Sequence, residues 1–345
     1  MIDKETDFHQ VHFDSIQALR GVTALFIVLE HIRFLGCGAF GVDIFFCISG
    51  FMIMFSTHTD TRYFLRKRLI RILPLYYLMT IGTYLLLVLF PDMFQQTKAD
   101  PVFLLKSLLF LPFDIGAGAL QPLMRIGWTV NCEIFFYLLF MISMRISHRF
   151  RGLVCSLLLL GVIAAAYLVP APPEFLVFYG NPVMLEFIFG ILCYYICRSL
   201  YRRYQAGGLP VFCSFLGIFG LLAGFAGLAI TKNHINVLGF YRPLKWGMPA
   251  LAIVLCAFLA GLYHDRIPGP LVRLGDISFS LYLVHYYPVM LLDRFVFDFS
   301  APSLRAYLGV AVAFAVSTTL SLVCWRLIEK RFSRWLRIKF LTTSK

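Results

Sequence analysis

Charged residues are scarce in this chain of 345 residues, and long polar stretches are missing. Asp, Glu, Lys and Arg make up 14% of the sequence, whereas hydrophobic residues make up 60%. The mean hydropathy is +0.79. Because a water-soluble domain needs more polar residues than this to cover its surface, the composition excludes a soluble globular protein. No internal repeat, low-complexity tract or soluble domain is visible in the sequence.

Cysteines with metal-ligand spacing are also nearly absent. Nine cysteines are present, mostly within apolar stretches, and only Cys193 and Cys197 are four positions apart. Two sulfur atoms do not make a zinc site, so the sequence predicts no bound metal. We interpret the cysteines as small packing residues, with Cys37 the one candidate for a reactive thiol.

Apolar stretches near twenty residues long are what the chain has in abundance. Counting them predicts about ten membrane spans. They centre near residues 16–34, 39–56, 72–90, 128–145, 152–170, 183–200, 211–230, 246–263, 275–296 and 306–327. The chain is therefore predicted to be an all-α integral membrane protein, a polytopic bundle of about ten transmembrane helices. The first span contains charges and is too long for a secretory signal, so we expect it to be retained.

Acidic residues are outnumbered by basic ones, 18 against 31, which gives a net charge of +13. If the N and C termini are both cytoplasmic, 22 of the 31 Lys and Arg residues lie on the cytoplasmic side, as the positive-inside rule requires. This distribution favours membrane topology over nucleic-acid binding as the reason for the charge. We interpret the basic tail, residues 330–345, as a cytoplasmic anchor for anionic lipid headgroups rather than a binding site.

The expected domain organisation is a single transmembrane domain over residues 1–345, without a fused extracytoplasmic domain. The longest stretch outside the spans is the outer segment 91–127. Its apolar run at 102–113 could form a re-entrant or interfacial helix that covers a site from outside.

Two ionisable residues lie in the first span, Arg20 and His31. They are eleven positions apart, so a helix would place both on one face, about 16 Å from each other along its axis. Ionisable side chains inside a bilayer are costly, and function is the default explanation for them. The spacing indicates one reagent that is held at both ends.

Further titratable residues fall in the outer half or the middle of the membrane when the loop charges orient the spans. They are Glu30, Asp43, Glu133, Glu186 and His285, with Thr129 and Tyr137 on the face of Glu133 and Ser278 and Tyr282 on the face of His285. A carboxylate at matching depth can fix an imidazole tautomer and raise its basicity, as general-base or nucleophilic chemistry requires. The outer half of the bundle is therefore the predicted chemical centre.

The inner half has the pattern of an anion site. Arg20 shares the cytoplasmic side with a basic run that opens the third span, in which Pro74 suits the first helical turn. The run contains Arg66, Lys67, Arg68 and Arg71. Five cations around one cavity suit a ligand with several phosphate groups. The alternative for residues 66–71 is a topology anchor, which does not account for Arg20 within its span.

Seven parts of the chain resemble, in content and in order, the membrane acyltransferase family 3. They are QALRG (17–21), His31, GVDIFFCISGF (41–51), FLRKRLIRILPLYY (64–77), GWTVNCEIFFYLLF (127–140), LEFIFGILCYY (185–195) and LGDISFSLYLVHYYP (274–288). Within the family, the chain looks most like the exopolysaccharide acetyltransferases of the ExoZ type. The family motif of an arginine, ten residues and a histidine maps onto Arg20 and His31. The motif GVDxFFxxSGF contributes Asp43 and Ser49, and W[ST]xxxE contributes Trp128, Thr129 and Glu133.

The resemblance implies a bacterial inner-membrane enzyme, a multi-pass O-acetyltransferase. It would take an acyl group, usually acetyl, from cytoplasmic acetyl-CoA and deliver it to a hydroxyl of a surface polysaccharide or lipid-linked glycan. Polysaccharide assembly proteins are possible partners, together with membrane lipids. Acceptor selection would rest on the bundle, on segment 91–127 or on such a partner.

Residue roles follow from the resemblance and the depth analysis together. Arg20, Arg66, Arg68 and Arg71 would bind the donor phosphates, and the thioester would reach His31. His31 would be a general base or would accept the acyl group itself, while Glu133 or Asp43 orients its ring. Candidates for donors to the developing oxyanion or for substrate contacts are Ser49, Trp128, Tyr282 and His285. For His285, helix packing is an equally open interpretation, and for Gly41 and Gly50 it is the favoured one.

Two other classes of protein remain possible. A transporter or flippase of a lipid-linked glycan could use the same intramembrane charges as a proton relay. It would not require a cation cluster below a histidine on one helix face, and the two matching halves with broken helices that would favour it are not found. A scaffold in a polysaccharide assembly complex would leave the polar interior unexplained.

Overall fold

The computed structural model describes residues 7–58, 61–91, 98–114, 120–230, 239–263 and 267–341. Within these ranges the chain is helical and forms no β-strand beyond an isolated bridge between Asp114 and Leu120. The prediction of an all-α protein is therefore confirmed. The chain forms two compact units. The first comprises Met1–Thr61 and Leu185–Ser321, and the second comprises Arg62–Met184 and Leu322–Lys345.

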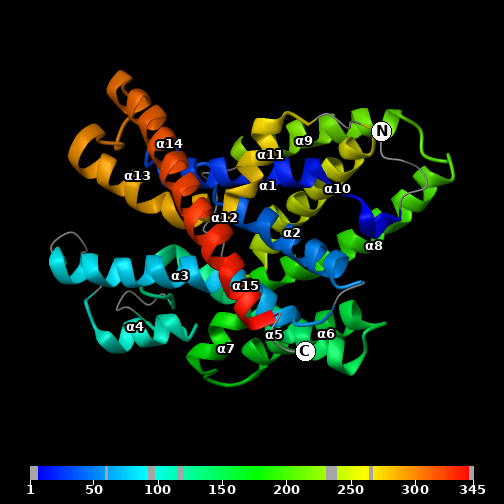
Figure 1. The fold of residues 1–345 in the computed structure, drawn as a ribbon, viewed down its shortest axis with the longest axis horizontal. Helices are drawn as coiled ribbons and strands as arrows, with labels where there is room; N and C mark the ends of the chain where they lie inside the picture. The colour runs from blue at the N-terminus through cyan, green and yellow to red at the C-terminus, as the bar shows by residue number, and fades with distance from the viewer. Residues whose placement is uncertain are drawn as a thin grey trace. The chain divides into compact units, whose positions relative to one another are not determined.

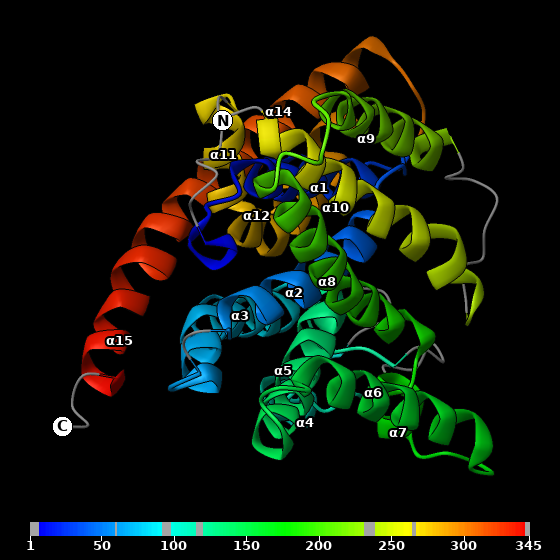
Figure 2. The same ribbon diagram turned by 90° about the vertical axis from the view of Figure 1, so that its right-hand side faces the viewer.

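The first unit contains most of the helices of the chain (Figures 1 and 2). They are α1 (Asp14–Glu30), α2 (Gly41–Ser56), α8 (Leu185–Gln205), α9 (Phe212–Ile230), α10 (Met248–Tyr263), α11 (Gly269–Asp276), α12 (Ser278–Val284), α13 (Tyr286–Leu292) and α14 (Leu304–Cys324), with the short elements η1 (Phe8–Gln10), η6 (Pro243–Gly247) and η7 (Asp293–Phe297). The most extensive pairings are α2 with α8, α9 with α10, and α1 with α11.

The second unit is built on α3 and α5. Its elements are α3 (Phe64–Leu89), α4 (Pro101–Leu108), η3 (Arg125–Gly127), α5 (Trp128–Ile146), α6 (Arg151–Leu168), α7 (Glu174–Tyr179), η4 (Pro182–Met184), η8 (Trp325–Phe332) and α15 (Ser333–Leu341). Helix α5 packs on α6, while α4, η8 and α15 all pack on α3. Helix α4 lies in the predicted outer segment 91–127 and overlaps its apolar run at 102–113. The hydroxyls of Tyr76 and Tyr77 on α3 donate hydrogen bonds to the carbonyls of Ser107 and Leu108 and so fix α4 to α3. Residues 92–97 and 115–119 of the predicted outer segment, and residues 342–345 of the tail, lie outside the described ranges.

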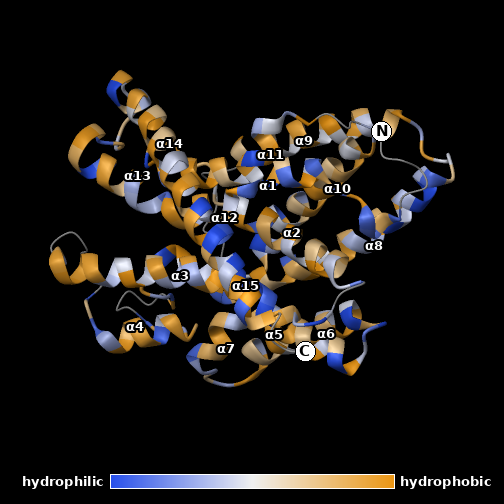
Figure 3. Cartoon of the chain, viewed as in Figure 1, coloured by the Kyte–Doolittle hydropathy of each residue, from blue (hydrophilic) through white to orange (hydrophobic). Residues whose placement is uncertain are grey.

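Seven helices in the described ranges are long and apolar enough to cross a membrane. Hydrophobic residues predominate along these helices (Figure 3). On α9, for example, Phe219 and Leu222 are 70% and 68% exposed, as lipid-facing residues would be. The chain is a multi-pass membrane protein. Helices α1 and α2, with 17 and 16 residues, are shorter than the roughly 20 residues of a typical membrane span. The count of ten spans and the side of the termini therefore stay predictions.

The predicted ninth span, 275–296, is not one continuous helix. It is divided at Ile277 and at His285 into α11, α12 and α13. Pro288 accounts for the second break, because it has no N–H to donate to the carbonyl of Val284 and its ring crowds that turn. The break places His285 at a helix junction rather than in mid-helix.

Pro74 also lies differently from its predicted position in a first turn. Because α3 begins at Phe64, Pro74 is in the helix interior, and the basic run of residues 66–71 is helical. A proline there leaves the carbonyl four residues earlier, that of Ile70, without its helical donor. The hydroxyl of Ser333 donates to this carbonyl over 3.0 Å in a buried contact. The proline thus creates the acceptor that fastens the C-terminal helix to α3.

Helices α2 and α8 touch at two glycines. A Cβ added to Gly50 would lie 2.3 Å from the carbonyl oxygen of Phe187, and one added to Gly190 would lie 2.1 Å from that of Cys47. Small residues allow membrane helices to approach this closely, where van der Waals packing rather than the hydrophobic effect holds them. The structure therefore supports the packing interpretation of Gly50.

We expect Gly50→Ala to destabilise the protein by about 1–3 kcal/mol, because the new methyl group meets backbone that cannot move aside without separating the helices. Thermal unfolding in detergent measures this change. Gly227→Ala in α9 is the matched control, since no heavy atom lies within 4 Å of its added Cβ, and alanine favours the helix. Equal unfolding temperatures for the two variants would contradict the close approach of α2 and α8.

Candidate functional site

His31 and His285 meet in the first unit. Nδ1 of His31 lies 3.1 Å from Nε2 of His285, and the ring centroids are 4.8 Å apart. His285 is fully buried, whereas His31 is partly exposed. His31 is the residue that follows α1 rather than one inside it, because the helix ends at Glu30. Both histidines therefore lie where a helix stops, and the side chains of residues far apart in the sequence form one pair.

Backbone carbonyls fix the tautomers of the two rings. Nδ1 of His31 is 2.9 Å from the carbonyl oxygen of Ile27, and Nδ1 of His285 is 2.9 Å from that of Leu281. A carbonyl only accepts, so each Nδ1 carries the hydrogen in a neutral ring. The one Nδ1–H of His31 is then shared between two acceptors, the carbonyl oxygen of Ile27 and Nε2 of His285. The basic nitrogen of His31 is consequently Nε2, which is the arrangement that a general base requires.

An ion-pair network holds the segments that follow the two histidines. Arg33 contacts Asp293 at 2.8 Å and Asp298 at 3.0 Å. Hydrogen bonds from Ser300, together with Arg33, lower the pKa of Asp298 below its usual value. Exposed pairs of this kind contribute little to stability one by one. Their effect here is to tie the chain after His31 to the chain after His285.

Asp43 forms a buried ion pair with Arg242, a residue that the sequence analysis did not select. Nε and Nη2 of Arg242 donate to the two carboxylate oxygens over 3.0 and 2.9 Å. Glu186 is also fully buried, and it interacts electrostatically with both Asp43 and Arg242. Arg242 further lies over the ring of Trp246, 5.2 Å from its centroid. The partner shown for Asp43 is thus a guanidinium, and the group beside the His31 ring is His285 rather than a carboxylate.

Glu133 lies in the second unit and accepts a hydrogen bond from Tyr137, one helical turn further along α5. The guanidinium of Arg68 lies 5.7 Å from the centroid of the Tyr137 ring. Glu133 and Arg68 were predicted for the outer and inner halves of the membrane, but the structure joins them through Tyr137. Trp128 begins the same helix, where Gly127 precedes it.

The remaining predicted site residues are distributed over both units. Arg20 is partly buried in α1 and donates to Gln17 over 3.4 Å, and Gln17 in turn donates to Asp276 over 2.8 Å. Ser49 is on α2, and Tyr282, on α12, is buried with its ring 6.2 Å from that of His285. Arg66, Arg68 and Arg71 follow one another along the first turns of α3. No group of three His, Cys, Asp or Glu in the described part of the chain could hold a metal ion.

Arg242 was not predicted as a site residue, because it lies at the edge of a span, where a lone arginine resembles an ordinary loop cation. A weak signal was available. Asp43 falls inside an apolar span, where a buried carboxylate needs a cation, and Arg242 is one of few basic residues predicted for the same side.

The acyltransferase domain family matches residues 13–326 of the chain. The chain therefore belongs to this family and is a membrane acyltransferase. The match covers the histidine pair, the Asp43 ion pair and the basic run of α3. No solved structure matches the chain.

Among characterised relatives, the exopolysaccharide production protein ExoZ of Rhizobium meliloti is 31% identical over 268 residues, which cover 74% of this chain and 78% of ExoZ. The peptidoglycan O-acetyltransferase OatA of Listeria monocytogenes is 21% identical over 91% of the chain and 55% of its own length. The O-acetyltransferase OatA of Staphylococcus aureus is 24% identical over 80% of the chain and 50% of its own length. The chain spans about half the length of these two relatives. The family and the names of the relatives support the prediction of an O-acetyltransferase.

We expect Arg242→Gln to destabilise the protein by about 3–5 kcal/mol, because it leaves the buried carboxylate of Asp43 without its cation. Asp43→Asn should have a similar effect, and the double variant should lose less than the sum of the two. Thermal unfolding in detergent measures all three. Arg294→Gln, at an exposed position, is the control and should unfold like the parent. A parent-like Arg242→Gln variant would refute the structural role of the pair.

Proposed function

We propose that the chain transfers an acetyl group from cytoplasmic acetyl-CoA to a hydroxyl of a surface or lipid-linked polysaccharide, in the inner membrane of a bacterium. The observation that carries this proposal is the pair of His31 and His285, with Nδ1 of His31 at hydrogen-bond distance from the Ile27 carbonyl and from Nε2 of His285. The names of the relatives support the acetyl group and the polysaccharide acceptor. The basic residues of α3 support a donor that carries phosphates.

In this proposal, Nε2 of His31 removes the proton of the acceptor hydroxyl as its oxygen attacks the thioester carbon. The carbon–sulfur bond then breaks, the acetyl group remains on the acceptor oxygen, and the sulfur leaves as the thiol of CoA with the proton from His31. His285 is a positioning residue, since it accepts from Nδ1 of His31 and stabilises the imidazolium that forms. A route through an acetylated His31 would use the same nitrogen.

The other predicted residues receive roles in the same scheme. Arg20, Arg66, Arg68 and Arg71 bind the donor phosphates. Asp43 and Glu133 are supporting residues, each within its own unit, where Asp43 pairs with Arg242 and Glu133 with Tyr137. Ser49, Trp128 and Tyr282 are candidates for donors to the oxyanion.

We expect His31→Ala to reduce acyl transfer at least about 100-fold, the low end of a general-base contribution, at equal membrane abundance. His285→Ala should give a smaller loss, because it removes the orienting partner but keeps the base. O-acetyl groups on the polysaccharide, quantified by proton NMR, measure both. His12→Ala, outside the site and with 81% of its side chain exposed, is the control. Near-parental O-acetylation by His31→Ala would refute the assigned role.

Donor and acceptor should be used from opposite faces of the membrane. The loop charges place the basic run of α3 in the cytoplasm and segment 91–127 outside. In vesicles of uniform orientation, labelled acetyl-CoA should acetylate a glycan acceptor on the other side only when the donor is on the side of the basic run.

Two results of this vesicle experiment would contradict the scheme. Movement of intact glycan lipid across the membrane without acetylation would contradict the enzyme and support a flippase instead. Acetylation that requires both substrates on the cytoplasmic face would keep the enzyme but refute an outward-facing acceptor site.

A further inference from the structure

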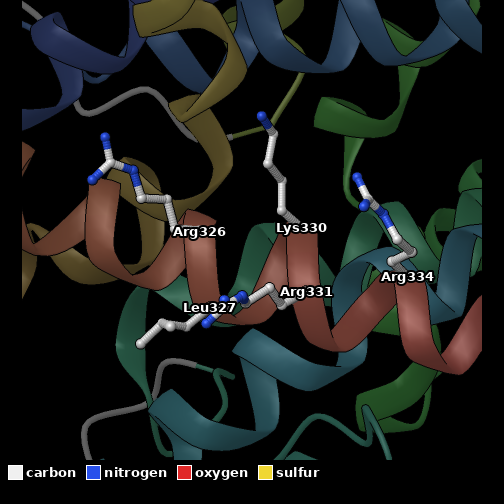
Figure 4. A pocket seen from close by; sticks show the side chains of 5 residues that line it. All are labelled: Arg326, Leu327, Lys330, Arg331 and Arg334. Atoms are coloured by element: carbon white, nitrogen blue, oxygen red, sulfur yellow. The ribbon is translucent and has the colours of Figure 1, made fainter.

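Basic residues of η8 and α15 line a cavity near the C-terminus. The cavity has a volume of about 410 Å³ and is lined by Arg326, Leu327, Lys330, Arg331 and Arg334 (Figure 4). In this view the side chains of Arg326, Lys330 and Arg334 extend from the same side of the helix. We call this feature the C-terminal cation pocket. Its volume is within the range of small-molecule sites.

Four cations line the pocket, and in the described part of the chain no salt bridge to an acidic residue is found for them. Lys330 lies over the Trp325 ring, 4.1 Å from its centroid. Like charges one turn apart destabilise a helix. A bound anion would remove this repulsion, whereas an empty pocket retains it.

The helix has an unusual form at the pocket. Residues Trp325–Phe332 form the π-helix η8, whose turns are wider than those of α14 and α15 on either side. Such insertions are rare and often occur at functional sites. Arg326 and Arg331, five residues apart on this helix, both line the C-terminal cation pocket.

The pocket helix is also fixed to α3. The hydroxyl of Ser333 donates to the carbonyl that Pro74 leaves free, that of Ile70. Helix α3 carries Arg66, Arg68 and Arg71, the predicted phosphate ligands. The pocket therefore belongs to the same compact unit as those cations and is attached beside them, instead of forming a loose basic tail.

We propose that the C-terminal cation pocket binds phosphate groups of the acyl-CoA donor, an inference that rests on the proposed function. Coenzyme A carries a pyrophosphate and a separate ribose 3′-phosphate, so it presents two groups of negative charge. Arginine forks and a lysine match phosphate oxygens. The phosphate of an anionic lipid headgroup has the same chemistry, so the test must distinguish these two sources.

The test is CoA binding by calorimetry to the purified protein in nanodiscs of phosphatidylcholine. The pocket variant is Arg326→Gln, Lys330→Gln and Arg334→Gln combined. We expect its Kd for CoA to be at least about tenfold higher than that of the parent, since charge-assisted hydrogen bonds to phosphate are lost. The control variant combines Arg145→Gln, Arg202→Gln and Arg203→Gln. It loses the same charge at exposed positions outside the pocket and should keep the parental Kd.

Each contrary result has a distinct meaning. If the pocket variant and the control bind CoA equally well, the inference is overturned. If the pocket variant in addition loses phosphatidylglycerol that the parent retains in native mass spectrometry, the pocket is a headgroup site instead. If the parent itself binds no CoA, the donor in the proposed function is wrong. The single variants Arg326→Gln and Arg334→Gln, with unfolding temperatures as a check on folding, give the same decision if the triple variant is unstable.

Discussion

In a chain this apolar, every backbone carbonyl and amide group within the membrane needs a partner from the protein, because the surrounding hydrocarbon offers none. Helices meet this requirement except where they end or contain a proline. At those places side chains take over. His31 bonds to the carbonyl of Ile27 and Ser333 to that of Ile70, while the ring of His285 bonds to the carbonyl of Leu281, which also accepts the backbone N–H of His285. The requirement for backbone partners thus accounts for the position of the His31 ring and for the attachment of the C-terminal helix.

The two compact units divide the polar residues by chemistry. The first contains the histidine pair and the buried pair of Asp43 and Arg242, which are suited to proton transfer and to holding α2 against the segment before α10. The second contains the basic start of α3, the C-terminal cation pocket and Glu133 with Tyr137. Removing the charge of Arg242 would leave the buried carboxylate of Asp43 without its cation, so we expect this pair to hold α2 to the segment before α10.

Helix content and the membrane character could be predicted from the sequence, because apolar runs are local signals. The roles of the candidate site residues stay predictions. The family match supports the motifs that carried the resemblance. The side chains that pair with these residues could not be predicted. A carboxylate was expected beside the His31 ring, but His285 lies there in the structure, and Asp43 pairs with Arg242. Depth along a span does not determine which helices are neighbours or which way a side chain turns.

The sequence by itself determined that the chain crosses a membrane, which residues are ionisable within its apolar stretches, and that Arg20 and His31 lie eleven positions apart in the first of them. Those properties depend on composition and on spacing along one chain. Only the tertiary structure decided that His31 meets His285, that Arg242 neutralises Asp43, and that the basic tail continues as a helix fastened to α3. Such contacts join residues up to 263 positions apart. They depend on close helix packing, as at Gly50 and Gly190, and on breaks at prolines, which no local pattern specifies.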